Sequence, residues 1–134
     1  LVSRVAIQHK CTILLKGPTD VVCSSPFDWF GSAHHKSAQA VRGSEEPSGS
    51  RRGEIRCERI SGGNAGMTKG GTGDVLAGLV AALYCKNNDP FLVATSASYL
   101  NKKAGESLLK RVGYYFNASD LADEIPGVMK KLII

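Results

Sequence analysis

The sequence Ser61-Gly-Gly-Asn-Ala-Gly-Met-Thr-Lys-Gly-Gly-Thr-Gly-Asp74 carries six glycines in fourteen residues and lies between a strand-like and a helix-like stretch. Glycine at this density allows positive φ angles and lets the backbone approach a ligand closely. The free N–H groups at the start of a helix point outward, with the positive end of the helix dipole behind them. The stretch therefore predicts an anion-binding loop that leads from a strand into a helix.

Three short stretches around this loop have the pattern of β-strands. Residues 12–16 are apolar and end at Gly17-Pro18, and residues 20–24 resume an extended pattern. Residues 54–60 alternate in character, as the residues of a half-exposed strand do. We expect the second and third of these strands to form a hairpin.

Helical spacing begins at Asp74. Apolar residues recur every three or four positions from Val75 to Tyr84, which predicts a buried helix. Residues 1–10 resemble the last turns of an amphipathic helix rather than a signal peptide, and the first residue is Leu1 rather than Met. We therefore expect the chain to begin in the middle of a longer protein.

Two further helices are predicted near the carboxyl end. Asp89-Pro90 supplies an N-cap and a first-position proline for a helix that should stop at Gly113. Ser119 is expected to cap a third helix, which Pro126 should kink or split. Strands followed by such helices place the chain in the α/β class.

Composition and charge are those of one ordinary globular domain. The 134 residues are 43% hydrophobic and 22% charged, with a net charge of +5. A positive balance favours anionic ligands without choosing between nucleotides and nucleic acid. No membrane span is expected, because the longest apolar run, residues 75–84, is far shorter than the roughly 20 residues that cross a bilayer. The four cysteines form no C-x-x-C pair, which favours reduced thiols over disulfides.

Residues 26–53 interrupt the pattern of strands and helices. They are rich in Ser, Gly, Ala and Arg and have no sustained period. Loops longer than about 12 to 15 residues without structure of their own are uncommon inside compact domains. We expect this stretch to be a disordered insertion or a gene-model artefact such as retained intron sequence.

Asp74 needs an explanation, because a carboxylate at the start of an anion-binding helix would repel a phosphate that it faced. Beside the phosphoryl group, it could take the proton of an attacking hydroxyl while the amides of residues 71–73 hold the transferring group. The alternative is an ordinary N-cap aspartate. Familiar nucleotide motifs do not fit: Gly70 follows Lys69 where the P-loop needs Ser or Thr, and Leu76 stands where G-x-G-x-x-G needs glycine.

Two motifs give the chain a resemblance to a known family. Lys16-Gly-Pro-Thr-Asp20 and Asn64-Ala-Gly-Met-Thr-Lys-Gly-Gly-Thr-Gly-Asp-Val-Leu-Ala-Gly78 resemble the ATP-dependent NAD(P)H-hydrate dehydratases of the ribokinase-like superfamily. The resemblance implies an α/β protein with the ribokinase-like three-layer α/β/α fold, incomplete because the amino-terminal half is absent. Residues 1–134 would form a partial nucleotide-binding domain, with residues 26–53 as an insertion within it.

The resemblance also implies an activity, since members of this family repair hydrated NADH and NADPH. It implies ATP-dependent dehydration of (6S)-NADHX and (6S)-NADPHX to NADH and NADPH. Asp74 would bind the substrate and act as the catalytic base, beside the amides of Gly71 and Gly73. Mg²⁺ is expected with the ATP, on ligands that the sequence does not name. The residues assigned to ATP are Lys16, Gly17, Pro18, Thr19, Asp20, Asn64, Ala65, Gly66, Met67, Thr68, Lys69, Gly70, Gly71, Thr72 and Gly73.

Other interpretations remain beside this one. A ribokinase-like small-molecule kinase would use the same Gly-x-Gly-Asp helix start, and an inactive fragment of the dehydratase would keep the motif without turnover. A nucleic-acid-binding module is disfavoured, because the aromatic residues are not interleaved with basic ones. The family resemblance implies a cytoplasmic protein, with a mitochondrial form as the alternative, and the sequence gives no oligomeric state.

Overall fold

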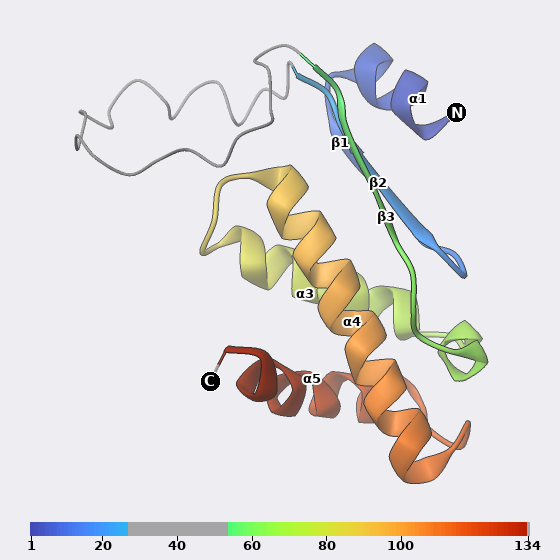
Figure 1. The fold of residues 1–134 in the computed structure, drawn as a ribbon. Coiled ribbons are helices and arrows are strands. Elements are labelled where there is room, and N and C mark those ends of the chain that lie inside the picture. The colour runs from blue at the N-terminus through green and yellow to red at the C-terminus, as the bar shows by residue number, and fades with distance from the viewer. Residues whose placement is uncertain (27–53, 134) are drawn as a thin grey trace.

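The computed structural model describes residues 1–26 and 54–133, which form a small sheet with helices on both of its faces (Figure 1). In chain order the elements are α1 (Val2–His9), β1 (Thr12–Leu15), β2 (Asp20–Ser24), β3 (Arg56–Ile60), the 3₁₀ helix η1 (Ala65–Thr68), α3 (Thr72–Tyr84), α4 (Pro90–Val112) and α5 (Ala118–Ile133). Of the predicted insertion at 26–53, residues 27–53 lie outside the described residues. None of the helices in the described part is long and apolar enough to cross a membrane.

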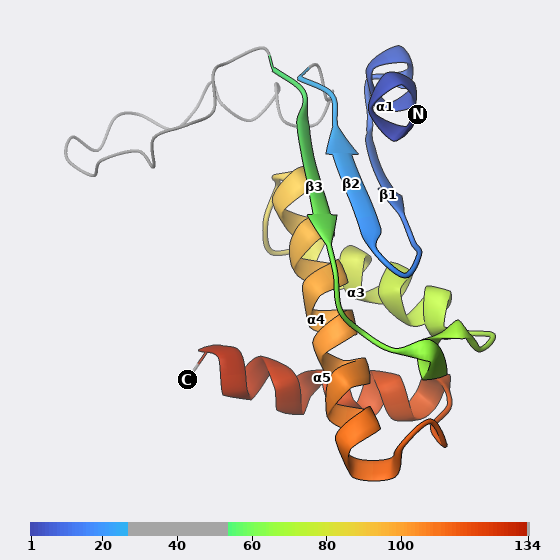
Figure 2. The same cartoon turned by 45° about the vertical axis from the view of Figure 1, so that its right-hand side comes forward.

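The three strands form an antiparallel sheet in the order β1-β2-β3. The expected pairing of the second and third strands is confirmed, with Asp20 opposite Ile60 and Ser24 opposite Arg56. Helix α1 lies against one face of the sheet, and α4 runs across the other (Figure 2). The predicted α/β class with layered helices is therefore confirmed.

The expectation that all four cysteines are reduced is wrong. Cys23 and Cys57 form a disulfide, while Cys11 and Cys85 are free. The two bonded residues are opposite each other in the register of β2 and β3, which brings their side chains to the same face of the sheet. A separation of 34 residues in the chain gave no indication of this pairing.

Apolar packing falls into two clusters on either end of α4. One joins the sheet to α4 and is formed by Val22, Ile60 and Ala94. The other joins α4 to α5 and the glycine-rich loop, and its buried members are Met67, Ala104, Leu108, Phe116, Leu121, Ile125 and Val128. Because both clusters include α4, this helix connects the sheet to the segment that carries the glycines.

Helix α3 is buried on one face rather than all round. Its apolar stripe does face inward, with Val75 and Leu79 packed against the second cluster. Its opposite face, which includes Ala77, Gly78 and Ala81, is exposed. The prediction of a buried helix is thus correct for the stripe and wrong for the outer face. The residues of that face are small rather than polar, so the sequence did not indicate that they are exposed.

The ends of the other helices mostly follow the sequence. Asp89 caps α4, Pro90 takes its first position, and Gly113 follows its last residue, all as expected. The cap of α5 is Asn117 rather than Ser119, because the Asn117 carboxamide oxygen accepts from the backbone N–H groups of Ser119 and Asp120.

Pro126 does not split α5, which runs through it from Ala118 to Ile133. A proline inside a helix removes one backbone hydrogen bond. The buried stripe of Leu121, Ile125 and Val128 packs against α4 and Phe116, and this packing holds the helix together across the proline.

Candidate functional site

A cavity of about 560 Å³ lies where the β1–β2 turn, the glycine-rich loop and α4 meet. Its volume is in the range of sites that hold small molecules and cofactors. The lining residues are Lys16, Gly17, Pro18, Asp20, Gly62, Gly63, Asn64, Ala65, Met67, Thr68, Asn101 and Lys102. Parts of the two motifs singled out in the sequence, which are far apart in the chain, therefore meet at one cavity.

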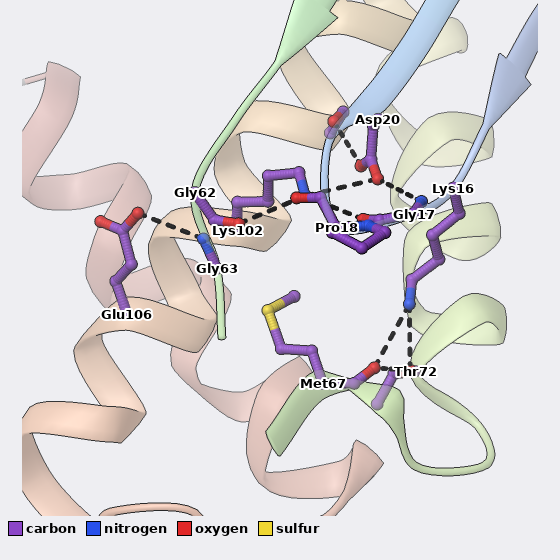
Figure 3. Close-up of polar contacts among 11 residues, drawn as sticks. Lys16, Gly17, Pro18, Asp20, Gly62, Gly63, Met67, Thr72, Lys102 and Glu106 are labelled. Atoms are coloured by element: carbon purple, nitrogen blue, oxygen red, sulfur yellow. Dashed lines mark hydrogen bonds and ion pairs between the residues drawn. The ribbon is translucent and has the colours of Figure 1, made fainter. Parts of the chain in front are cut away.

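The wall of this cavity is organised by Lys102, which sequence analysis missed. The residue is only 5% exposed, and its ammonium group donates to the carbonyl oxygens of Gly17, Pro18 and Gly62 at 3.2–3.3 Å (Figure 3). It also forms an ion pair with Asp20 at 3.3 Å. Lys102 thus fastens the β1–β2 turn to the beginning of the glycine-rich loop.

Asp20 lines the cavity, but its carboxylate is committed to protein donors. The residue is 1% exposed, and it accepts hydrogen bonds from the backbone N–H of Gly17 at 2.9 Å and from the hydroxyl of Ser98 at 2.7 Å. With Lys102 as a third partner, the carboxylate fixes the shape of the turn. The predicted direct contact between Asp20 and a nucleotide stays a prediction.

Lys16 reaches from the end of β1 to the start of α3. Its ammonium group donates to the carbonyl oxygen of Met67 at 3.3 Å and to the hydroxyl of Thr72 at 3.4 Å (Figure 3). The Thr72 hydroxyl in turn donates to the carbonyl oxygens of Met67 and Lys69. A mobile positive charge therefore stands beside the first turn of α3, where an anion would also meet the helix dipole.

The glycine-rich loop is held by close contacts with α4. The Asn64 side chain accepts from the backbone N–H of Gly66 and donates to the carbonyl oxygen of Gly105 at 2.7 Å. Met67 packs directly over Gly105, where a Cβ atom would lie 2.2 Å from the Met67 sulfur. At Gly63, φ is +74° and a Cβ would meet the same sulfur at 2.8 Å. Small residues at both positions are what lets the loop pack this closely.

The Glu106 carboxylate lies at the edge of this loop and accepts two hydrogen bonds. Glu106 accepts from the backbone N–H of Gly63 at 3.2 Å and from the ammonium of Lys103 at 2.8 Å. The Lys103 hydrogen bond, followed by that of Gly63, lowers the pKa of Glu106 against the opposing effect of partial burial. The ionised carboxylate of Glu106 therefore holds the loop in place.

The start of α3 is open. Gly71 caps the helix with φ +85° and supplies no side-chain hydrogen bond. Asp74 lies in the first turn and is exposed rather than turned into the core. Apart from chain neighbours and the helix's own backbone, no described heavy atom comes within 4 Å of the place a Cβ would take at Gly70 or Gly73. The described structure thus leaves space at these two glycines, while Ala118 lies close to Gly71 between them.

The candidate residues fall into two groups by position. Eight of those predicted to bind ATP line the cavity: Lys16, Gly17, Pro18, Asp20, Asn64, Ala65, Met67 and Thr68. The others do not line it: Thr19, Gly66, Lys69, Gly70, Gly71, Thr72, Gly73 and the catalytic candidate Asp74. Thr72 is nevertheless connected to the cavity through its contact with Lys16.

Lys69 points away from the cavity. Its ammonium group donates to the carbonyl oxygens of Tyr114 and Phe116 and lies 5.3 Å from the centre of the Phe116 ring. This side chain joins the glycine-rich loop to the segment between α4 and α5. Its assignment to ATP gains no support from this position.

Sequence analysis also missed Asn101, which lines the cavity from α4 and is 1% exposed. A helical asparagine followed by two lysines gave no sign of burial in the sequence. For its neighbour Lys102 the sequence did offer a signal of burial. Ala94, Ser98 and Lys102 recur every four residues, and the small residues at the first two positions indicate close packing against the sheet.

Comparisons with known proteins point to one family. A family model described as NAD(P)H-hydrate dehydratase matches residues 53–127, more than half of the chain. The bifunctional NAD(P)H-hydrate repair enzyme Nnr of Methanocaldococcus jannaschii is 54% identical over 68 residues, which are 51% of this chain and 14% of that protein. The ADP-dependent (S)-NAD(P)H-hydrate dehydratase of Cenarchaeum symbiosum is 35% identical over 130 residues, which are 97% of this chain and 35% of that protein.

A solved structure supports the fold. Bacillus subtilis YxkO, a member of the UPF0031 family, superposes with a TM-score of 0.71 at 24% identity, over 97% of this chain and 38% of that one. The chain therefore spans about a third or less of the length of these relatives. The fold and the motifs therefore correspond to one part of each of these longer proteins.

Proposed function

The chain belongs to the NAD(P)H-hydrate dehydratase family, and we propose that it serves the nucleotide-dependent dehydration of hydrated NADH and NADPH. The observation that carries the proposal is the cavity that Lys16 shares with Asn64, Ala65, Met67 and Thr68 of the loop. These residues come from the two motifs that the family resemblance assigns to the nucleotide. Their meeting in one site is what a nucleotide-binding role requires.

The proposed reaction uses the open start of α3. The ring hydroxyl of the substrate attacks the terminal phosphorus of the nucleotide, and the bond from that phosphorus to the bridging oxygen breaks. Asp74 takes the hydroxyl proton, while the amides of Gly71 and Gly73 and the Lys16 ammonium bear the charge of the phosphoryl oxygens. Phosphate then leaves with its bonding electrons, and loss of a proton from the neighbouring ring carbon restores the double bond of NADH.

Exposure of Asp74 supports its role as a base. The carboxylate lies in the first turn of α3 beside the amides, and it is accessible to a substrate. An ordinary N-cap aspartate would stand before the helix and accept from its first N–H groups, as Asp89 does in α4. At α3 the N-cap is Gly71, so capping does not account for Asp74.

The donor nucleotide is proposed to be ATP, following the Lys-Gly-x-x-Asp form of residues 16–20, which resembles the ATP-using branch of the family. The names of two relatives specify ADP instead. Among the described residues, no three His, Cys, Asp or Glu side chains come together to hold a metal ion. Mg²⁺ would therefore come with the phosphates, as it commonly does, rather than in a cage of side chains.

The test is nucleotide binding and turnover by the 134-residue chain. We expect ATP to bind, with ADP measured in parallel, and conversion of hydrated NADH to be weak, because the chain spans only 35% of a relative that it covers almost end to end. Robust turnover by this chain would contradict the expected weakness and strengthen the dehydratase assignment. Absence of binding to either nucleotide would overturn the proposal.

A parallel assay separates the dehydratase from a small-molecule kinase. Phosphorylation of a sugar or hydroxymethylpyrimidine at a rate above that of NADH repair would favour the kinase. Location is a further part of the proposal: we expect a cytoplasmic protein, which cell fractionation with an antibody would test.

A further inference from the structure

One polar side chain of the cavity has no role in the site so far. Asn101 falls in a stripe of α4 with Ala97, Ala104 and Leu108, and these four residues are at most 1% exposed. Among the described residues, neither the nitrogen nor the oxygen of its carboxamide has a hydrogen-bond partner. Buried polar groups are almost always paired, so this amide calls for a partner.

The position of Asn101 indicates where that partner comes from. The residue lines the cavity beside Lys102, whose own donors are all used by the protein. Asn101 is therefore the lining side chain of α4 that still has both a donor and an acceptor to offer. Both atoms are buried in the described structure, so a molecule in the cavity would satisfy them once the carboxamide turns toward it.

The chemistry of a carboxamide restricts what it would bind. The group is neutral and offers a donor and an acceptor side by side, so it does not attract phosphate as Lys16 does. Adenine presents the complementary pair, the exocyclic N6 amine and the N7 acceptor, whereas guanine presents two acceptors on the same edge. Asparagine recognises adenine through this edge in nucleic-acid complexes.

We propose that Asn101 is the residue that recognises the adenine base, pairing its carboxamide with N6 and N7 of the nucleotide. The inference rests on the proposed function, since it needs an adenine nucleotide in the cavity. It adds the determinant of base specificity, which neither sequence motif contains. Lys16 and the loop would bind phosphates, and α4 would select the base.

The experiment compares three triphosphates on the 134-residue chain by calorimetry: ATP, GTP and purine riboside triphosphate, which lacks the N6 amine. We expect the wild type to prefer ATP over the other two by about tenfold or more, the usual size of base discrimination by a bidentate pair. Asn101→Leu, which is similar in size, should lose that preference. Asn87→Leu, the same change in an exposed loop residue, should keep it.

Thermal unfolding of the same variants separates recognition from structure. Removing an unpaired buried amide should leave the melting temperature of Asn101→Leu unchanged or higher. A folded Asn101→Leu that still prefers ATP over purine riboside triphosphate would overturn the inference while leaving the proposed function intact. Equal binding of ATP and the analogue by the wild type would overturn it even if the variant failed to fold. No ATP binding by the wild type would overturn both.

Discussion

The amino ends of α3 and α4 are built in opposite ways. At α4 the Asp89 carboxylate accepts from the backbone N–H groups of Phe91 and Leu92, and Pro90 has no N–H to satisfy. At α3 the cap is Gly71, with positive φ and no side-chain hydrogen bond. Each helix start leaves backbone N–H groups that need acceptors. At α4 the Asp89 side chain supplies them, whereas at α3 the Thr72 N–H donates to the carbonyl oxygen of Lys69 at 3.5 Å and the proposed function assigns the N–H groups that follow to an anion.

The surroundings of the two ends differ in the same sense. Beside α4, the Arg56 guanidinium forms two hydrogen bonds with the Asp89 carboxylate, so charge is neutralised within the protein. Beside α3, the partners of the Lys16 ammonium among the described residues are neutral oxygens, of Met67 and Thr72, and no carboxylate in that part of the chain forms an ion pair with it. One helix start thus has its charges paired within the protein, and the other carries a positive charge, as the proposed anion binding requires.

The largest expected effect comes from Asp74, at the open end. Asp74→Ala should lower turnover of hydrated NADH by about 10²- to 10⁴-fold, the usual contribution of a general base, while ATP affinity changes little. The reason is that the carboxylate accepts a proton and does not hold the nucleotide. Steady-state rates and nucleotide titration on the same preparations give both quantities.

Asp123→Ala is the matched control, since Asp123 is an exposed aspartate on α5. It should leave both quantities near their wild-type values. Loss of ATP binding by Asp74→Ala, with normal turnover per bound complex, would assign Asp74 to nucleotide binding and not to proton transfer.

The next effect concerns the cavity beside the open end. Lys102→Met should lower the free energy of unfolding by about 3–5 kcal/mol, the usual result of removing one partner from a buried ion pair. Asp20, 1% exposed, would be left without its counter-charge. Urea denaturation measures the change. Lys103→Met, at the next position but with an exposed ion pair, should cost far less.

A double variant sharpens this result. Asp20→Leu combined with Lys102→Met should be more stable than Lys102→Met alone, because no unpaired buried charge remains. A double variant less stable than the single one would show that the bonds from Asp20 to Gly17 and Ser98 matter more than the ion pair.

A substitution at Gly71 tests whether the backbone conformation at the start of α3 requires glycine. Gly71→Ala should lower stability by about 1–2 kcal/mol, because a residue with a Cβ is strained at φ +85° and that Cβ would lie 2.9 Å from the Cβ of Ala118. Gly78→Ala, in the middle of α3 with no atom near its Cβ position, should instead raise stability by about 1 kcal/mol. Opposite signs in thermal unfolding would confirm that conformation, not helix propensity, requires Gly71.

The same contrast shows what the sequence could predict. The cap and proline of α4, the stop at Gly113 and the β2–β3 pairing follow from local patterns, and all are confirmed. The Cys23–Cys57 bond was missed because it depends on the register between strands that are 34 residues apart in the chain. Register is set by packing of the whole sheet, which spacing between cysteines does not record.

For the cavity, the motifs predicted the part lined by the glycine-rich loop and Lys16 but not the part lined by α4. Asn101 and Lys102 carry no motif, and polar side chains on a helix are usually solvated. Their burial depends on how α4 lies across the sheet, which is tertiary information. Lys69 is the converse case, a lysine within the motif whose ammonium binds the carbonyl oxygens of Tyr114 and Phe116 instead.

The smallest effect is expected at the capped end. Partial burial alone would raise the pKa of Asp89, but the Arg56 hydrogen bond and the backbone N–H groups of Leu92 and Phe91 outweigh it and lower the pKa below 3.8. Asp89→Asn keeps a capping side chain and removes the charge. Because the Arg56 pair is more than a third exposed, the loss at neutral pH should be only roughly 0.2–1 kcal/mol.

The dependence on pH identifies that loss as electrostatic. A carboxyl group whose pKa is lowered by folding adds stability above its unfolded pKa, and this stability is lost as the pH falls through the folded value. The difference between wild type and Asp89→Asn should therefore be constant at neutral pH and close below about pH 4. A gap that persists in acid, measured by urea denaturation across that range, would mean that the asparagine is a poorer cap by geometry and that the charge contributes nothing.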